Sequence, residues 1–327
     1  MNCRGLSLMS GGLDSQLAVR VLQSAGAEVE AVCFSTPFFD CTGARRAAEA
    51  LGVKLHLVDF TDDELALIRH PPHGFGGAMN PCIDCHAQMI RRAGELMSRL
   101  GFDFVATGEV LGQRPMSQNR QSLGIVERSS GLQGRLVRPL SAKLLEPTLP
   151  ETDGSLDRAR LLDISGRSRD RQIALAAEFG IVDYPSPAGG CKLTEDGFSR
   201  KLRDLMEHEG LESRKLVELL LVARRFRLPG GSSVALGRDR GENAVLRELV
   251  CEGMVLAPVN VPGPTAFVPS LKSEEDLALA LGLVVAYSRH DRLAGNVCVA
   301  VRTARGATER EVPRPYDREP FKPFQIC

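Results

Sequence analysis

A short segment near the start of the chain carries the residue types that bind phosphate. Residues 10–15 read Ser-Gly-Gly-Leu-Asp-Ser, between an apolar stretch at 5–9 and a segment with helical spacing at 16–22. Glycines let the backbone turn tightly and present its N–H groups, serine hydroxyls add donors, and a following helix contributes the positive end of its dipole. The segment therefore predicts a polyanion-binding loop between a strand and a helix.

Cysteines are the second group of residues that could do chemistry. Cys82 and Cys85 are spaced as Cys-x-x-Cys at the start of a predicted helix, and Cys191 lies in a loop rich in proline and glycine, 184–194. On its own, a Cys-x-x-Cys pair fits a redox pair, half of a zinc site, part of an iron–sulfur site or two buried thiols. The remaining cysteines are predicted to be apolar packing residues, apart from Cys327, which has no assigned role; they are Cys3, Cys33, Cys41, Cys251 and Cys298.

Length and composition limit the class of protein. The chain has 327 residues, which is enough for two domains. Basic and acidic residues number 41 each, so any contact with nucleic acid must come from a local patch. The sequence has no apolar run of about 18 residues and no signal-peptide pattern, and its cysteines are unevenly spaced. We therefore expect a soluble, cytoplasmic protein that does not contact a membrane and has no disulfide framework.

The elements that position these residues alternate along the first part of the chain. Strands are predicted at 29–34, 53–58 and 102–107, and helices at 14–24, 41–51 and 86–100. This alternation predicts an α/β fold with a doubly wound parallel sheet, which binds ligands at the carboxyl ends of its strands. A further amphipathic helix is predicted at 169–180. We place the first domain at residues 1–210 and a second, smaller α+β domain at 211–327.

The phosphate-binding segment resembles the PP-loop of the N-type ATP pyrophosphatase family. It lacks the Gly-Lys-Ser/Thr ending of a Walker loop and has Asp14 in a central position. The resemblance implies that Ser10, Gly11, Gly12 and Ser15 hold the pyrophosphate end of ATP, with Mg2+ near Asp14. Residues 106–109, Ala-Thr-Gly-Glu, resemble the family's segment that helps to hold the nucleotide, which adds Thr107 and Gly108 to the predicted site.

Three further segments resemble the PP-loop tRNA thiolation enzymes, which include the tRNA 2-thiouridylases and 4-thiouridine synthases. These are Asn-Pro-x-x-x-Cys at 80–85, Ala-Thr-Gly-Glu, and a glycine-flanked cysteine followed by Thr-Glu-Asp-Gly-Phe at 194–198. In the 2-thiouridylase branch, Cys85 would match the cysteine that attacks or releases, and Cys191 the cysteine that carries persulfide sulfur. Cys82 is additional to that branch. Together with it, the three cysteines match thiolation enzymes that bind a [4Fe-4S] cluster, which we favour over a Cys85–Cys191 persulfide pair and over structural zinc.

The C-terminal part begins a separate module near Gly210. A basic and aromatic segment, a Pro-Gly-Gly turn at 229–231 and a Gly-Arg-Asp segment at 237–239 predict two strands joined by a tight turn and then a helix. The pattern resembles the NFACT-R RNA-binding domain up to about residue 305, although Asp239 replaces its usual asparagine. The resemblance implies RNA binding by five arginines that a hairpin could gather on one surface, and they are Arg224, Arg225, Arg227, Arg238 and Arg240.

These observations lead to one preferred function and two alternatives. The preferred function is ATP-dependent tRNA thiolation, in which a uridine or cytidine carbonyl is adenylated and its oxygen is replaced by sulfur. The sulfur donor would be sulfide, the persulfide of a cysteine desulfurase or a carrier protein, and the sequence also leaves a homodimer open. The alternatives are a PP-loop enzyme that adenylates a small molecule, for amide or nitrile formation or sulfur transfer, and a non-catalytic RNA-binding protein that senses ATP.

Overall fold

The computed structural model describes residues 3–186, 190–289, 295–313 and 317–327. Residues 187–189 of the predicted cysteine loop and 290–294 of the C-terminal module therefore lie outside the described residues. Contacts divide the chain into Met1–Thr194, here unit 1, and Glu195–Cys327, here unit 2. The expected boundary at 210/211 differs from this division because one helix, α8 (Asp196–His208), groups with unit 2.

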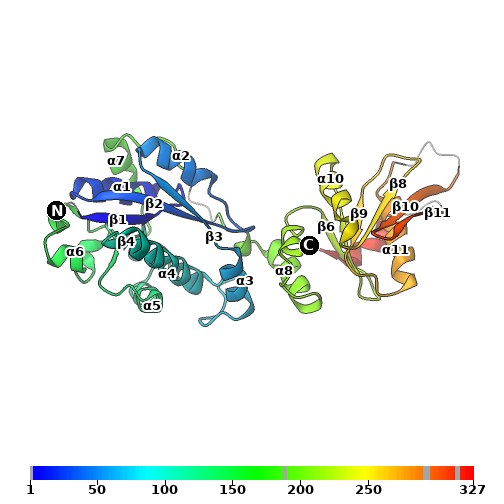
Figure 1. The fold of residues 1–327 in the computed structure, drawn as a ribbon, viewed down its shortest axis with the longest axis horizontal. Helices are drawn as coiled ribbons and strands as arrows, with labels where there is room; N and C mark the ends of the chain where they lie inside the picture. Colours follow the sequence, from blue (N-terminus) through cyan, green and yellow to red (C-terminus); the bar gives the residue numbers. More distant parts are fainter. Residues whose placement is uncertain (1–2, 187–189, 290–294, 314–316) are drawn as a thin grey trace. The chain divides into compact units, whose positions relative to one another are not determined.

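Unit 1 alternates strands with helices for most of its length (Figure 1). Its strands are β1 (Arg4–Leu8), β2 (Glu28–Ser35), β3 (Leu55–Asp59), β4 (Phe104–Ala106) and β5 (Leu136–Val137). Its helices are α1 (Leu13–Ser24), α2 (Thr42–Leu51), α3 (Thr61–Arg69), α4 (Cys82–Leu100), α5 (Arg120–Ser130), α6 (Leu149–Thr152) and α7 (Asp170–Glu178). Short 3-10 turns occur at Ala142–Leu144, Arg158–Arg160 and Lys192–Thr194.

The sheet of unit 1 is parallel throughout, with strand order β3-β2-β1-β4-β5. Strands β2 and β3 are added on one side of β1, and strands β4 and β5 are added on its other side. The order in which strands join the sheet therefore changes side between β1 and β4. These two strands are direct neighbours, with Gly5 opposite Phe104 and Ser7 opposite Ala106. Parallel sheets bind ligands at such a switch point, in the crevice beyond the carboxyl ends of the strands.

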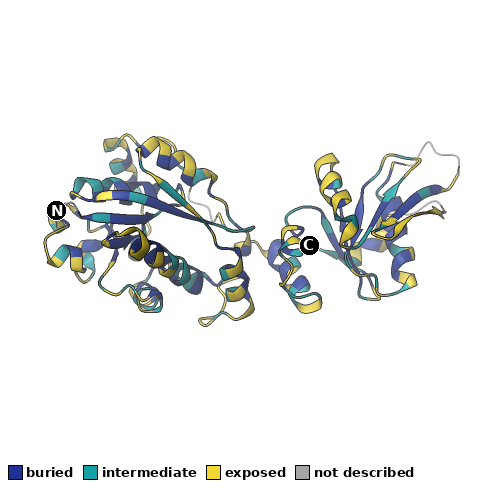
Figure 2. Cartoon of the chain, viewed as in Figure 1, coloured by how far each residue is buried: buried dark blue, intermediate teal, exposed yellow. Residues whose placement is uncertain are grey.

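Helices cover both faces of this sheet, as a doubly wound fold requires (Figure 1). Phe104 and Ala106 of β4 pack into a core with α1, α2 and α7. Val105, which lies between them, packs into a second core with α4 and α5. Consecutive strand residues point to opposite faces, so one short strand contributes to both cores. Figure 2 shows the same division, with buried strands and exposed outer faces of the helices.

Unit 2 combines helices with a single antiparallel sheet. Its helices besides α8 are α9 (Arg214–Glu218), α10 (Arg240–Glu248) and α11 (Glu274–Ala286), with 3-10 turns at Leu249–Cys251 and Glu319–Phe324. Its strands are β6 (Arg224–Arg227), β7 (Ser233–Leu236), β8 (Met254–Pro258), β9 (Ala266–Val268), β10 (Val297–Thr303), β11 (Gly306–Val312) and β12 (Gln325–Ile326). The sheet order is β11-β10-β8-β9-β7-β6-β12.

The predicted hairpin of unit 2 is present. β6 and β7 pair antiparallel, and the turn between them closes with a hydrogen bond from Leu228 N–H to the Ser232 carbonyl at 2.9 Å. α10 then begins after Asp239, whose side chain accepts from Glu242 N–H at 3.0 Å. An aspartate at this position is thus a helix N-cap. The fold class predicted from the sequence is confirmed for both parts of the chain.

The predicted elements of unit 1 are observed with small shifts in their ends, but α3 and α5 were not predicted. α5 has the sequence Arg-Gln-Ser-Leu-Gly-Ile-Val-Glu-Arg-Ser-Ser, with one glycine and three serines that favour a helix weakly. It is stabilised by the Asn119 side chain, which accepts from Ser122 N–H at 2.8 Å, and by the burial of Leu123 and Val126. Among the described residues, no helix is both long and apolar enough to cross a membrane.

Candidate active site

The predicted phosphate loop joins β1 to α1, as expected. Gly12 is the N-cap of α1 and no side chain caps this helix end, so its first N–H groups face the loop. Gly11 has φ +84°, a conformation that favours glycine, and a Cβ there would lie 2.3 Å from a backbone carbon of Gly43 at the start of α2. The loop is therefore shaped by close backbone packing, and it presents a helix N-terminus that suits a polyanion.

Asp14 lies in the first turn of α1, and only one of its two carboxylate oxygens has a hydrogen-bond partner among the described residues. Gln113 donates from Nε2 to Asp14 Oδ2 at 3.1 Å. Asp14 Oδ1 is buried and has no hydrogen-bond partner among the described residues. A buried carboxylate oxygen without a partner costs free energy unless a cation or donor satisfies it, and carboxylate is a preferred ligand of Mg2+. Asp14 thus fits the predicted role at a magnesium ion.

Thr107 and Gly108 follow β4 and lie against the phosphate loop. A Cβ on Gly108 would be 2.6 Å from the carbonyl carbon and oxygen of Asp14 and 2.7 Å from Ser15 N. Backbone therefore packs directly on backbone at this point, which only glycine allows. The structure thus brings together the two segments that are predicted to bind the nucleotide and that lie about a hundred residues apart in the sequence.

A buried charge network continues from the same strand end. Glu109 accepts from Arg138 Nε and from the Thr107 hydroxyl, both at 3.0 Å, and lies 3.2 Å from Nδ1 of His86 in α4. Burial alone would raise the pKa of Glu109, but the charge of Arg138 and the contact with His86 lower it to about 2. Arg138 also donates to Glu127 at 3.0 Å. The network ties the start of α4 to the segment that follows β4.

The start of α4 carries Cys82 and Cys85. Cys85 is 8% exposed, and burial, followed by the nearby Glu64 carboxylate, raises the pKa of its thiol well above the ordinary value. Cys191 and Cys82 lie close enough to raise it further. Burial also raises the pKa of Glu64 to about 7, against the opposing effects of Cys85 and His86. Cys85 therefore lies beside a buried carboxyl group, and Cys82 and Cys191 are near enough to affect its titration.

This arrangement fits an iron–sulfur cluster only in the types of its donors. Thiolates are the ligands of such clusters. However, no group of three or more His, Cys, Asp or Glu side chains among the described residues is placed to hold a metal ion. No step of the chemistry below is therefore assigned to a cluster.

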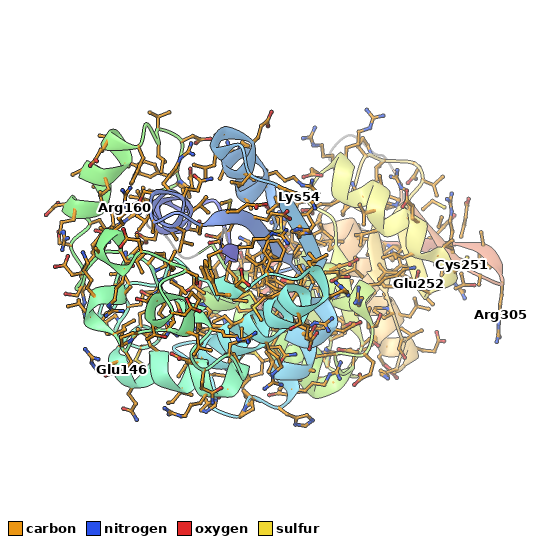
Figure 3. The ribbon with its side chains drawn as sticks, turned by 60° about the vertical axis from the view of Figure 1, so that its left-hand side comes forward. Lys54, Glu146, Arg160, Cys251, Glu252 and Arg305 are labelled. Atoms are coloured by element: carbon orange, nitrogen blue, oxygen red, sulfur yellow. A yellow bond between two sulfur atoms is a disulfide. The ribbon has the colours of Figure 1, made fainter. Side chains whose placement is uncertain are left out.

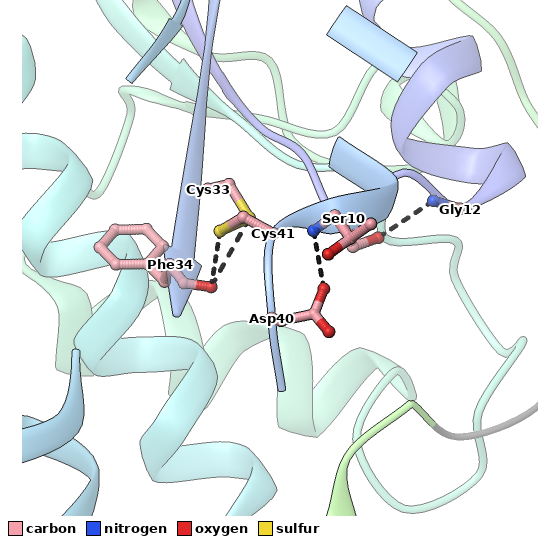
Figure 4. The surroundings of a disulfide bond; sticks show 7 residues. Ser10, Gly12, Cys33, Phe34, Asp40 and Cys41 are labelled. Atoms are coloured by element: carbon pink, nitrogen blue, oxygen red, sulfur yellow. Dashed lines mark hydrogen bonds between the residues drawn. A yellow bond between two sulfur atoms is a disulfide. The ribbon is translucent and has the colours of Figure 1, made fainter. Parts of the chain in front are cut away.

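Of the five cysteines predicted to be packing residues, two form a disulfide within the core and two others lie outside the core. Cys33 at the end of β2 and Cys41 at the start of α2 form a disulfide near the phosphate loop (Figure 4). Cys251 is exposed, and its side chain lies at the surface in Figure 3. Cys298 is half-buried and contacts Glu309 at 3.1 Å. Cys3, Cys33 and Cys41 are all buried in the core as expected. Cys251 and Cys298 are not, because apolar neighbours in sequence do not determine which face of an element a side chain occupies.

The hairpin does not gather the five arginines of unit 2 on one surface. Strand alternation divides them: Arg224 lies over the ring of Tyr287, whereas Arg225 and Arg227 point to the opposite face of β6. Arg227 donates to both Asp204 and Glu209 of unit 2 and is mostly buried. The guanidinium of Arg227 is therefore already paired with these carboxylates, and the ion pairs connect α8 to the hairpin.

Arg225 is also unsuited to direct contact with a ligand in this conformation. It is 1% exposed, and burial lowers the pKa of its guanidinium to about 10. Arg238 and Arg240 are exposed, although Arg238 pairs with Glu242. Of the five predicted arginines, Arg224, Arg238 and Arg240 therefore remain within reach of solvent.

The sequence left Gln113 undecided, because its polar loop at 113–120 could contact nucleotide or RNA or be solvated. Gln16 and Glu64 carried no recognisable signal, because they occupy helix positions that amphipathic spacing cannot distinguish from surface positions. Gln16 is nevertheless 2% exposed and Glu64 is 1% exposed. Their burial follows from tertiary packing at the strand ends.

Fold and loop together define an α/β domain with a glycine-rich loop between its first strand and first helix, followed by a β-rich module. Residues 1–143 match the family described as Thiamine biosynthesis protein (ThiI). Residues 223–322 match the NFACT protein RNA binding domain. Both resemblances stated from the sequence are confirmed by these matches.

Relatives with curated names are similar to part of this chain. A tRNA-specific 2-thiouridylase MnmA 1 of Syntrophus aciditrophicus is 27% identical over 229 residues, which cover 63% of this chain and 56% of that protein. A probable tRNA sulfurtransferase of Caldanaerobacter subterraneus is 32% identical over 148 residues, which cover 42% of this chain and 37% of that protein. The chain thus spans about half of the length of these relatives or less.

A solved structure, a 4-thiouridine synthetase–RNA complex with bound ATP, is also similar to this chain. The match has 20% sequence identity and a TM-score of 0.39, and it covers 55% of this chain and 41% of that one.

The contact of Gly108 with the phosphate loop leads to a first prediction. Gly108→Ala places a methyl group within 2.6 Å of the Asp14 backbone, so the loop must shift by an amount that typically costs about 1–3 kcal/mol. We expect ATP binding, measured by calorimetry, to weaken about tenfold or more. Gly77→Ala is the matched control, because a Cβ there meets nothing within 4 Å. Equal affinities of the two variants would contradict the prediction.

The Glu109 network leads to a second prediction, on pH. The pKa of Glu109 is lowered from 4.5 to about 2 in the folded protein, so its contribution to stability is present above about pH 4.5 and is lost as the pH falls towards 2. Between pH 5 and pH 3 the wild type should lose about 2 kcal/mol of unfolding free energy that Glu109→Gln does not lose. Urea denaturation at both pH values measures this difference. Glu95→Gln, at an exposed position of α4, should follow the wild type; a pH dependence of Glu109→Gln equal to that of the wild type would refute the assignment.

Proposed function

We propose that this chain is an ATP-dependent tRNA sulfurtransferase that releases AMP and pyrophosphate. The observation that carries the proposal is that the phosphate loop and the helix with two cysteines are connected at one end of the unit 1 sheet. The phosphate loop contacts Gly108, and the next residue, Glu109, joins His86 of the helix that begins with Cys82 and Cys85. The similarity to relatives named 2-thiouridylase and tRNA sulfurtransferase supports the same activity.

The first step activates a carbonyl of a tRNA uridine or cytidine. The carbonyl oxygen attacks the α-phosphorus of ATP, the bond to the bridging oxygen breaks, and pyrophosphate leaves. N–H groups at the start of α1, together with Ser10 and Ser15, would bind the pyrophosphate end and offset its charge. Mg2+, when bound at Asp14, supplies charge neutralisation on the phosphates. Thr107 and Gly108 would hold the nucleotide beside the loop.

The second step replaces oxygen by sulfur. In the persulfide route, the terminal sulfur on Cys191 bonds to the activated ring carbon, and AMP leaves with the former carbonyl oxygen. The thiol of Cys85, after losing its proton, then attacks Cys191 Sγ, so that the sulfur stays on the base and a Cys85–Cys191 disulfide forms. A dithiol reductant resets the pair. Cys82, Cys85 and Cys191 are also the residues that would hold a [4Fe-4S] cluster, and no step is assigned to that group here.

Unit 2 would bind the RNA. Its match to an RNA-binding domain supports this role, and Arg224, Arg238 and Arg240 are the predicted arginines that solvent reaches. Arginines of this kind contribute affinity to the phosphate backbone rather than sequence choice. Arg225 and Arg227 would act indirectly, by holding the hairpin. We further propose that the protein works in the cytoplasm and takes sulfur from sulfide, a desulfurase persulfide or a carrier protein, while a homodimer stays a prediction from the sequence.

Thiolation is tested with the purified protein, tRNA, ATP, Mg2+ and sulfide or a cysteine desulfurase. We expect AMP release that depends on tRNA, together with a thionucleoside that mass spectrometry detects in digested tRNA. Asp14→Asn should slow AMP release by about 100-fold, because it weakens the magnesium site. Asp170→Asn, at an exposed position of α7, is the matched control and should leave the rate unchanged.

The same assay separates the alternatives. AMP release without tRNA would indicate a small-molecule substrate, and ATP binding without AMP release would indicate a sensor. Either result would overturn the proposal. A strain that lacks the protein yet keeps all its thionucleosides would do so as well.

The cluster and the persulfide are separated by iron analysis. Protein purified without oxygen should contain about four iron atoms per chain if Cys82, Cys85 and Cys191 hold a [4Fe-4S] cluster, and Cys82→Ser should lower this content. Iron-free protein that still thiolates tRNA would exclude the cluster and leave the persulfide route. Cys251→Ser, which changes an exposed cysteine, serves as the control.

A further inference from the structure

Gln113 distinguishes the two carboxylate oxygens of Asp14. Its Nε2 donates to Asp14 Oδ2 at 3.1 Å, whereas Asp14 Oδ1 is buried and has no hydrogen-bond partner among the described residues. An ionised carboxylate only accepts hydrogen bonds, so the amide of Gln113 must present its nitrogen, and not its oxygen, to Asp14. The contact joins the phosphate loop to a residue 99 positions further along the chain.

The backbone next to Gln113 is fixed by hydrogen bonds to other parts of unit 1. Leu111 N–H donates to the hydroxyl of Ser141, a fully buried residue, at 2.9 Å. Gly112 N–H donates to the Gln118 carbonyl at 2.7 Å. These bonds form without any ligand, so Gln113 presents its amide from a backbone that is already in place.

A donor on one oxygen decides how a carboxylate meets a cation. A free carboxylate turns about the bond that joins it to Cβ, and its two oxygens are then equivalent ligands. With Oδ2 of Asp14 bonded to Gln113, Oδ1 is the oxygen that remains for a cation. Carboxylates that bind metals are commonly hydrogen-bonded in this way, and loss of such a partner typically weakens metal binding by about 10–100-fold.

We propose that Gln113 is a positioning residue of the cation site: it holds Asp14 so that Oδ1 binds the Mg2+ that accompanies ATP. The inference rests on the proposed function, since it takes ATP as the ligand of the phosphate loop and Asp14 as the residue at the metal. It adds a residue that lies outside both segments predicted to bind the nucleotide. Gln113 acts on the metal through Asp14, and an experiment can isolate this dependence.

The substitutions that isolate this role remove the donor and keep the backbone of the loop. Gln113→Met has a similar length and volume and no donor, and Gln113→Ala removes the donor by truncation. Gln121→Met is the matched control, because Gln121 lies at an exposed position of α5. Asp14→Asn and the double variant Asp14→Asn/Gln113→Met complete a double-mutant cycle.

The test is calorimetry of α,β-methylene ATP binding to the full chain, with Mg2+ in excess and with EDTA in place of Mg2+. The ratio of the two affinities measures the contribution of the cation. In the wild type and in Gln121→Met, Mg2+ should strengthen binding about tenfold or more. In both Gln113 variants this ratio should fall about fivefold or more, whereas the affinity in EDTA should stay within about twofold of the wild type.

The cycle asks whether Gln113 works through Asp14. Asp14→Asn should lose most of the strengthening by Mg2+, because an amide is a weaker ligand of this cation than a carboxylate. The addition of Gln113→Met to Asp14→Asn should then change the ratio no further, since the carboxylate that Gln113 positions is already absent.

Three results would overturn the inference. The first is a Mg2+ effect of wild-type size in the Gln113 variants. The second is equal weakening of these variants with Mg2+ and with EDTA, because that pattern marks a merely structural contact. The third is a further fall of the ratio when Gln113→Met is added to Asp14→Asn. A wild type that does not bind the analogue, or an Asp14→Asn variant that keeps the full Mg2+ effect, would instead refute the part of the proposed function on which the inference rests.

Discussion

The rest of unit 1 depends on one close approach of backbone to backbone. β1 and β4 are neighbours in a parallel sheet, so the segments that follow them leave the sheet at the same edge. Gly108 then lies against Asp14 and Ser15 with no room for a side chain. Through this contact, the segment after β4 packs against the phosphate loop. It also fixes the position of the next residue, Glu109, from which the buried network extends to His86 of α4. The nucleotide segment and the cysteines meet because of this register.

The buried groups at this edge of the sheet differ in their protonation. Arg138 holds Glu109 ionised, whereas burial favours the neutral forms of Glu64 and Cys85. A protonated, buried thiol is protected from adventitious oxidation and needs a specific change to become nucleophilic. The unpartnered oxygen of Asp14 has the opposite character, since a cation or a hydrogen-bond donor would stabilise it. The site therefore separates a carboxylate oxygen that is open to a ligand from a thiol that burial keeps protonated.

In unit 2, arginines at neighbouring positions of one strand have different environments. A strand that alternates Arg-Arg-Phe-Arg sends Arg225 and Arg227 towards α8 and leaves Arg224 on the face of Tyr287. Asp204 and Glu209, which receive Arg227, come from α8 and its end, outside the matched RNA-binding region. Basic residues in a hairpin thus need not form one binding surface, because alternate positions of a strand face opposite sides of the sheet.

Much of this protein follows from local sequence. The glycines of the phosphate loop, the Thr-Gly after β4, the hairpin turn and the alternation of strands and helices are properties of short segments, since turn geometry and periodicity depend on neighbouring residues. They predicted the fold class and the two ligand segments. Tertiary structure alone decided the rest: that Gly108 contacts Asp14, that Cys33 pairs with Cys41, that Arg225 is buried, and that Gln16 reaches Asp183. Burial and long-range contacts depend on which strands become neighbours and which face of an element is covered, and neither is encoded in the spacing of nearby residues.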